Sequence, residues 1–434
     1  MRPSSACDTC RLRKRKCIVT GRSRPCTLCV LKGLDCSFIA TTQMEDFITP
    51  HHQENSLAGP GGGGPCAWDY PPPDVRRELV DLYFDLVHDK QHIIFHRYSF
   101  IQEQQQGRAA NFLVLGMIAL MARFSSNPYF EDIQPRDRAA PWLQRAIQAF
   151  NARPNLIDIQ SLQGCILLAF VAFVEGDSAQ DTLLSAQAVR MVQVLHLPVV
   201  LSPGAIQRET EIRLYWQTWM METWDCVQAQ LPAQLQSNPQ FPRPLEESVF
   251  SSMRCSQEQD RPADCQIAQR GPQGSGIWSL ILPLTEMHGL VVRLNDQLTH
   301  GTFSQSEIHA QVESLSCKLE SWLGSLPRSM RNTPSNRKMF SDQGLLQEFI
   351  NMHLLYHHQS QLLYYQFLHQ AVSSEEGPRD DPESKKYAGL CKLHATALSE
   401  IMWDMNLANT PCVWSPLNGH LLVIASSVHL HSML

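Results

Sequence analysis

Apolar residues recur through residues 74–434 with the 3.6-residue period of an amphipathic α-helix. In VRRELVDLYFDLV, at positions 75–87, Leu79, Leu82 and Leu86 fall on one face of such a helix. No convincing strand pattern, with apolar and polar residues alternating, emerges in this region. The pattern therefore predicts an all-α domain over residues 74–434.

The same period predicts further helices within this domain. They are expected near 109–124, 138–150, 159–174, 178–196, 202–227, 277–301, 305–325, 342–371, 384–406 and 416–432. The helix from 202 is expected to begin with Ser202 as its N-cap and Pro203 at its first position. From about 233 to 276 the sequence is polar and contains Pro, Ser and Gln, which predicts a long exposed loop.

The longest apolar runs, FLVLGMIAL at 112–120 and CILLAFVAFV at 165–174, are shorter than the roughly 18 to 20 residues needed to cross a bilayer. Buried core helices are expected there, and no membrane contact. The first residues lack the basic and then apolar order of a secretory signal, so the thiols are expected to be reduced.

The first 73 residues follow a different pattern. Residues 39–73 lack helical periodicity and contain GPGGGGP and then PPP, which predicts a flexible linker between an N-terminal module at 1–38 and the helical domain. No apolar heptad repeat follows the module, so no dimerising coiled coil is expected.

Charge separates the same two regions. Residues 1–36 hold nine Lys or Arg and two acids, whereas the remaining chain holds 27 Lys or Arg and 40 acids. The formal net charge of the whole chain is −6. This asymmetry indicates a basic module for a polyanion, carried on an acidic body.

Six of the 14 cysteines lie in that basic module. They are Cys7, Cys10, Cys17, Cys26, Cys29 and Cys36. A two-residue gap followed by a six-residue gap occurs twice in this set. In a reducing compartment, two cysteines separated by two residues favour a shared metal ion, and zinc is the usual metal of an all-sulfur site.

The number of cysteines limits the zinc stoichiometry. One zinc ion needs four ligands and two separate ions need eight, and no histidine precedes His51 to complete a second site. Two zinc ions that share two sulfurs use all six cysteines. The symmetry of the repeat nominates Cys7 and Cys26 as the bridging ligands.

The first six-residue gap reads RLRKRK and the second VLKGLD. Only the first gap, with Arg11, Arg13, Lys14, Arg15 and Lys16, can face a polyanion. Metal ligation would hold so short a helix rigid, and its cations suit phosphates. The same run also fits a nuclear import signal.

The cysteine spacing, the CRLRKRKC segment and the Pro25-Cys26 step resemble the fungal zinc binuclear cluster family of transcription factors. Three stretches of the body resemble the regulatory middle homology domain of this family. They are HIIFHRYSFI at 92–101, SAQAVRMVQVLHLP at 185–198 and EIRLYWQTWMMETWD at 211–225.

The resemblance implies a nuclear transcription factor of RNA polymerase II genes that holds two zinc ions and binds double-stranded DNA. The end of the first helix would enter the major groove at a GC-rich triplet, usually CGG. Lys14 matches the main base-contacting lysine of the family and Arg13 its neighbour, whereas Arg11, Arg15 and Lys16 are assigned to phosphates or solvent.

The family further implies contacts with the transcription machinery or co-regulators, and an activator or gene cluster regulator. Members often dimerise through a short coiled coil after the cluster. Because no such repeat is present here, symmetric half-site recognition and homodimerisation stay open.

Two other interpretations are an all-α enzyme or ligand-binding domain with the cluster as a targeting module, and a zinc-dependent protein-interaction adaptor. No catalytic residues are identified, so an enzyme is not expected. His353 and His357 lack the glutamate of a zinc-protease motif, and RDDPE at 379–383 resembles a terpene cyclase motif without its companion. The Trp and Met cluster at 216–224 fits core packing better than a small-molecule pocket.

Overall fold

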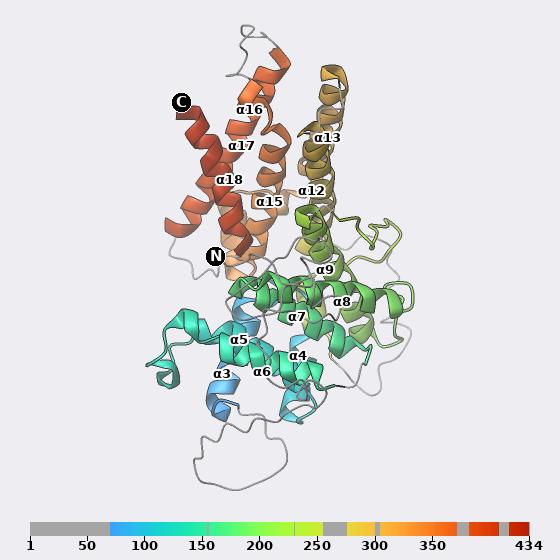
Figure 1. The fold of residues 1–434 in the computed structure, drawn as a ribbon, viewed down its shortest axis with the longest axis vertical. Coiled ribbons are helices and arrows are strands. Elements are labelled where there is room, and N and C mark those ends of the chain that lie inside the picture. Colours follow the sequence, from blue (N-terminus) through green and yellow to red (C-terminus); the bar gives the residue numbers. More distant parts are fainter. Residues whose placement is uncertain are drawn as a thin grey trace, which may run out of the picture. The chain divides into compact units, whose positions relative to one another are not determined.

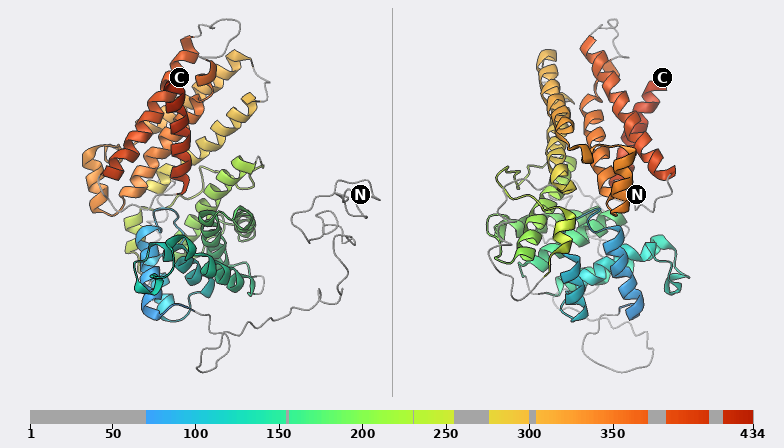
Figure 2. Two further views of the ribbon diagram at one scale, coloured as in Figure 1. Left: turned by 60° about the vertical axis from the view of Figure 1, so that its left-hand side comes forward. Right: turned by 180° about the vertical axis from the view of Figure 1, so that it is seen from behind.

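Regular secondary structure in the computed structural model is helical throughout the residues that the structure describes, with no β-strand (Figures 1 and 2). These residues are 70–153, 156–229, 231–254, 276–299, 304–370, 382–407 and 416–433. They belong to one compact unit, Trp68–Leu434. The predicted all-α fold of the body is confirmed.

The helices follow one another through this unit. In chain order they are α3 (Pro73–Leu86), α4 (Arg97–Gln105), α5 (Asn111–Met121), η1 (Ala122–Phe124), η2 (Pro128–Phe130), η3 (Pro135–Asp137), α6 (Ala140–Asn151), α7 (Ile159–Glu175), α8 (Ser178–Val194), α9 (Ala205–Ala229), α10 (Glu247–Ser252), α12 (Ile277–Thr299), α13 (Gln305–Ser325), η4 (Arg328–Met330), α14 (Pro334–Asp342), α15 (Leu346–Tyr364), α16 (Phe367–Gln370), α17 (Pro382–Leu407) and α18 (Pro416–Met433).

Most predicted helices are present with small shifts at their ends, but α4, α10 and α14 were not predicted. The predicted helix over 342–371 is wrong at its start, because Gly344 has a φ of 72° and ends α14. The Leu345 amide donates to the Phe340 carbonyl (2.9 Å), as in a Schellman motif. α15 therefore starts only at Leu346.

The predicted start of the helix from 202 is also wrong. α9 begins at Ala205, and the Ser202 backbone N–H donates to a carboxylate oxygen of Glu211 at 2.7 Å. The Ser202 hydroxyl donates to the same carboxylate. Ser202 therefore binds the middle of the helix and does not cap its first turn.

Helices that follow each other in sequence pack side by side. α5 packs on α3, α6 and α7, α7 on α8, and α8 on α9, while α12, α13, α15, α17 and α18 form a second group. α9 and α12 pack against each other and join the two groups (Figure 1). α12 is apolar and long enough to cross a membrane, but 67% of its apolar window is buried, as in a core helix.

The approach of α5 to α7 requires glycine at two positions. A Cβ atom on Gly164 would lie 2.4 Å from the Phe112 ring, and one on Gly116 would lie 3.0 Å from Leu167 and Leu168. All residues of α5 from Phe112 to Met121 are buried. α5 is thus an all-round apolar helix in the middle of the first group.

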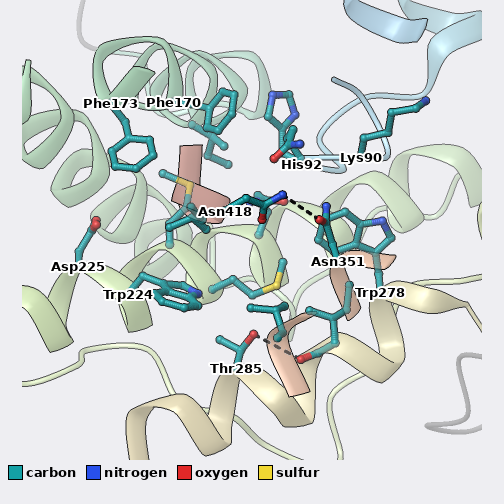
Figure 3. Close-up of a pocket in the computed structure, with 18 of the residues that line it drawn as sticks. Lys90, His92, Phe170, Phe173, Trp224, Asp225, Trp278, Thr285, Asn351 and Asn418 are labelled. Carbon is teal, nitrogen blue, oxygen red and sulfur yellow. Dashed lines mark hydrogen bonds between the residues drawn. The ribbon is translucent and has the colours of Figure 1, made fainter. Parts of the chain in front are cut away.

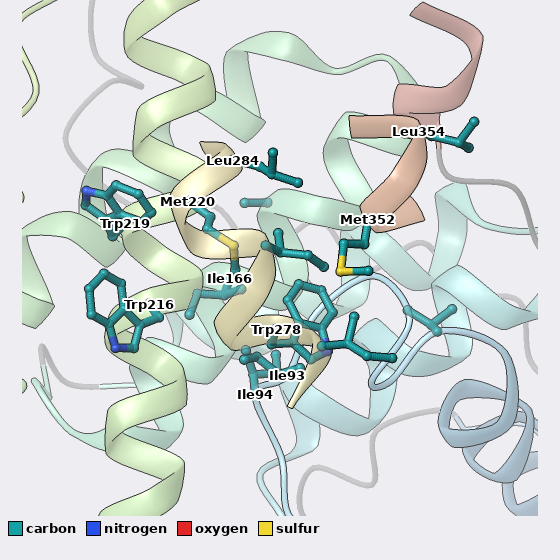
Figure 4. Close-up of a cluster of buried hydrophobic side chains, with 14 of the residues drawn as sticks. Ile93, Ile94, Ile166, Trp216, Trp219, Met220, Trp278, Leu284, Met352 and Leu354 are labelled. Carbon is teal, nitrogen blue, oxygen red and sulfur yellow. The ribbon is translucent and has the colours of Figure 1, made fainter. Parts of the chain in front are cut away.

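Side chains from distant segments meet in the core between the two groups (Figure 4). Ile93 and Ile94 come from the segment after α3, Trp216 from α9, Trp278 from α12 and Met352 from α15 (Figure 4). The segment before α4 is therefore part of the core, although it is not helical. The Ile93 amide donates to Gln217 Oε1 (3.2 Å).

A buried arginine connects this core to two non-helical segments. Arg213 of α9 is fully buried, and its Nε donates to Glu209 at 2.8 Å. Its Nη2 donates to the Leu245 carbonyl at 2.8 Å, its Nη1 lies 3.6 Å from Asp89, and its guanidinium covers the Phe250 ring at 4.4 Å. The ion cluster fixes residues 89 and 245–250 on α9.

The segment after α9 is a loop, as predicted, but side chains of α9 bind it closely. Glu222 accepts the backbone amides of Gln234 and Leu235, at 2.6 and 2.8 Å. The Tyr215 hydroxyl donates to the Gln236 carbonyl and the Trp216 indole to the Pro242 carbonyl. Side chains of α9 thus hold this segment along the helix. Residues 233–246 form no helix, as the loop prediction requires, but only some of them are exposed, and α10 at Glu247–Ser252 was not predicted. Residues 255–275 of that loop lie outside the described residues.

We expect Arg213→Met to destabilise the body by about 3–5 kcal/mol, because it leaves Glu209 buried without its cation. Thermal unfolding of the full chain by circular dichroism would measure this. Arg136→Met is the matched control, since the Arg136 side chain is 88% exposed. Equal melting temperatures of the two variants would contradict the role of the cluster.

Candidate functional site

The predicted zinc and DNA contacts lie outside the residues that the structure describes. These are Cys7, Cys10, Cys17, Cys26, Cys29 and Cys36, with Arg11, Arg13, Lys14, Arg15 and Lys16. In the part of the chain that is described, no group of three or more His, Cys, Asp or Glu side chains could hold a metal ion.

The described body contains a cavity of about 190 Å³ between its two groups of helices (Figure 3). Its wall is formed by side chains of α7, α8, α9, α12, α15 and α18 and of the segment after α3. Most of the wall is apolar, with Phe170, Phe173, Met220 and Leu421 among its residues. Such a cavity with few polar groups is typical of a small-molecule site.

Two carboxylates from neighbouring helices lie together on this wall. They belong to Asp181 of α8 and Asp225 of α9, and Ser185 hydrogen-bonds to both. Burial, with the charge of Asp225, raises the pKa of Asp181 to about 6. Burial also raises the pKa of Asp225, and the charge of Glu222 adds to this effect. Both carboxyl groups therefore lie in a poorly solvated place that disfavours their charged forms.

A third acid, Glu348 of α15, lines the cavity and is 1% exposed. Neither of its carboxyl oxygens has a hydrogen-bond partner among the described residues. Burial raises the pKa of Glu348 to about 8, although the charge of Lys90 acts against this rise. Glu348 is thus mostly protonated at neutral pH and can donate as well as accept a hydrogen bond.

Two amides complete the polar part of the wall. The Asn418 Nδ2 donates to Asn351 Oδ1 at 3.5 Å, so that α18 and α15 meet there (Figure 3). Figure 3 shows Asp225 and Lys90 on opposite sides of the cavity, with Asn418 between them. The cavity therefore has charged groups at two sides and both amide and apolar side chains between them.

Aromatic stacking fixes one wall. The Trp224 ring stacks on the His288 ring with centroids 3.8 Å apart. His288 Nδ1 donates to Gln359 Oε1 at 3.0 Å, and burial lowers the pKa of His288 to about 4. The imidazole is therefore neutral at physiological pH, and the stack behind Trp224 carries no charge.

The Trp and Met cluster of the sequence divides between two roles. Trp216, Trp219 and Met220 are buried in the core (Figure 4). Met220 also lines the cavity, together with Met221 and Trp224. The preference for core packing over a pocket was therefore right for only part of the cluster. The three acids were missed. The sequence feature that could have indicated such a buried acid is a charged residue within an apolar run, as in LQEFI around Glu348.

The histidines that suggested a metalloenzyme have other partners. His353 donates to the Met330 carbonyl at 3.0 Å, and His357 hydrogen-bonds to His394 with 2.9 Å between their Nδ1 atoms. Burial lowers the pKa of each of these histidines, as expected for neutral core side chains. RDDPE lies mostly outside the described residues.

Two family models match the chain. The fungal specific transcription factor domain matches residues 80–326, more than half of the chain. The fungal Zn(2)-Cys(6) binuclear cluster domain matches residues 5–45, which contain all six cysteines of the basic module. The first match contains the three body stretches quoted above.

Curated relatives agree with these matches. The Zn(2)-C6 fungal-type transcription factor FTF1c of Fusarium oxysporum is 22% identical over 391 residues, which are 82% of this chain and 41% of the relative. A transcriptional regulatory protein of Schizosaccharomyces pombe is 21% identical over 312 residues, 65% of this chain and 37% of its own. The chain thus spans about two fifths of the length of these relatives. No solved structure matches it significantly.

We expect Glu348→Gln to change how stability depends on pH. Glu348 holds a proton in the folded state between about pH 4.5 and pH 8, where the unfolded chain releases it. Its contribution to stability therefore falls as pH rises through this range. The difference in melting temperature, Glu348→Gln minus wild type, should therefore be a few °C more positive at pH 8 than at pH 5.

The control for this experiment is Glu131→Gln, whose side chain is exposed. Other titrating groups are common to all three proteins and cancel in the comparison. If the difference in melting temperature between Glu348→Gln and wild type is the same at pH 5 and pH 8, Glu348 is not protonated in the folded protein as we expect.

Proposed function

The chain belongs to the fungal specific transcription factor family and is a zinc-cluster, DNA-binding transcription regulator, and we propose that it reads a CGG-type triplet in the promoters of RNA polymerase II genes. The observation that carries the proposal is the difference between CDTCRLRKRKC and its twin CTLCVLKGLDC. Both have the same metal spacing, but only the first is cationic. One half of the repeat therefore faces DNA.

The donor set fits two zinc ions, which the Zn(2)-Cys(6) binuclear cluster domain binds. We assign Cys7 and Cys26 as the shared ligands and Cys10, Cys17, Cys29 and Cys36 as the terminal ones. Six thiolates give each zinc four sulfur ligands when two bridge. Bound zinc supplies the cross-links that a module of this size cannot obtain from a hydrophobic core.

Within RLRKRK we assign Lys14 and Arg13 to the bases. Arg and Lys donate to guanine O6 and N7, which distinguish G·C from the other base pairs in the major groove. Arg11, Arg15 and Lys16 are assigned to phosphates, where they fix orientation and supply salt-dependent affinity. The same run is proposed to direct the chain to the nucleus.

We further propose a cluster module at 1–38, a linker at 39–73 and a regulatory domain at 74–434. The regulatory domain would contact co-regulators or the transcription machinery, as an activator and not as an enzyme. Because 39–73 has no apolar heptads, homodimerisation, if present, would have to use another surface. Regulation of a gene cluster is compatible with this role.

Removal of zinc should abolish specific DNA binding by the full chain. The cysteines would then lose the metal that cross-links them, and the basic helix would lose its support. Fluorescence anisotropy with a CGG-containing duplex, before and after a chelator and after zinc is restored, measures the effect. Tight binding by the chelated protein would contradict the proposal.

Lys14→Ala should weaken binding to a CGG-containing duplex by about 1–3 kcal/mol relative to a duplex with a changed triplet. Lys32→Ala, in the six-residue gap VLKGLD of the second half, which has no net charge, is the matched control. It should leave the preference between the two duplexes unchanged. Selection of duplexes from a random pool by the full chain would show the triplet, spacing and stoichiometry, and a selected site without CGG would reject this specificity.

A further inference from the structure

The cavity between α8, α9 and α15 has the shape and polarity of a ligand site that is separate from DNA recognition. Its volume of about 190 Å³ corresponds to about a dozen water-sized positions, since one such position takes about 10–15 Å³. The wall contains the rings of Phe170, Phe173, Trp224 and Trp278. A matching occupant has an apolar or aromatic body of about a dozen non-hydrogen atoms.

The acids on the wall determine the charge of this occupant. Asp181 and Asp225 share only Ser185 as a side-chain hydrogen-bond partner, and no Lys or Arg pairs with either in the described part of the chain. Two poorly solvated carboxylates without a cation attract a positive group strongly. The indole face of Trp224, on the same wall, favours a cation as well.

The opposite side of the cavity provides hydrogen bonds. Glu348 is 1% exposed and both its oxygens lack partners among the described residues. An unpaired buried carboxyl group is costly unless a ligand supplies its partner. Asn351 and Asn418 lie on the same wall and add amide groups. Lys90 is the one cation among the lining residues, so the acids still outnumber the cations.

We propose that this cavity binds a small organic amine, with its ammonium group between Asp181 and Asp225, its apolar body against the aromatic wall and a polar group toward Glu348. The evidence for this site is independent of the DNA specificity proposed above. Tryptamine is a suitable probe because it has an ammonium group, an indole body and an N–H donor at the far side.

Isothermal titration of the full chain with tryptamine should show one saturable site. Tryptophol, which replaces the amine by a hydroxyl group, and indole-3-propionic acid, which replaces it by a carboxylate, should bind at least about tenfold more weakly. The same comparison is repeated with 3-phenylpropylamine and with the corresponding alcohol and carboxylic acid, in which a phenyl ring replaces the indole. Equal or stronger binding of the acids, or no binding of either amine, would overturn the proposal.

Asp225→Asn should weaken tryptamine binding at least about tenfold, since it removes one of the two negative charges at almost constant volume. Asp132→Asn is the matched control, because Asp132 is exposed and does not line the cavity. Thermal unfolding of each variant shows whether the fold is retained. A folded Asp225→Asn variant with wild-type affinity would place tryptamine elsewhere and overturn the site.

Discussion

The fully buried guanidinium of Arg213 is the interaction on which the rest of the body depends. A buried cation is tolerated only where anions and carbonyl groups surround it. Glu209, Asp89 and the Leu245 carbonyl provide these groups from three separate segments. The requirement to neutralise one charge therefore determines the paths of two segments that have no regular structure of their own, the one before α4 and the one after α9.

The same cluster extends toward the cavity. The charges of Asp89 and Glu247 both raise the pKa of Glu348, which itself lines the cavity wall. Trp278 also belongs to both places, since its indole donates to the Asp89 carbonyl at 3.2 Å and its ring lines the cavity. The ion cluster around Arg213 and the cavity therefore lie next to each other and share residues.

Much of the fold could be predicted from the sequence, because helical periodicity is a local property. Long helices such as α7 and α13 were placed to within one residue at each end. The path of the loop after α9 could not be predicted, because its hydrogen-bond partners are side chains of α9 and not its own residues. The cavity could not be predicted either, since Asp181, Asp225 and Glu348 are brought together only by packing. The predicted metal ligands, in contrast, follow a spacing that is visible in the sequence.

α9 holds three sets of partners along its length: the ion cluster near Arg213, the backbone of the following segment through Glu222, and the cavity through Trp224. Successive residues of an α-helix are rotated by about 100° around its axis. An insertion of one residue within α9 would therefore turn at least one of these sets away from its partners. The number of residues between Glu209 and Asp225 is fixed by this geometry.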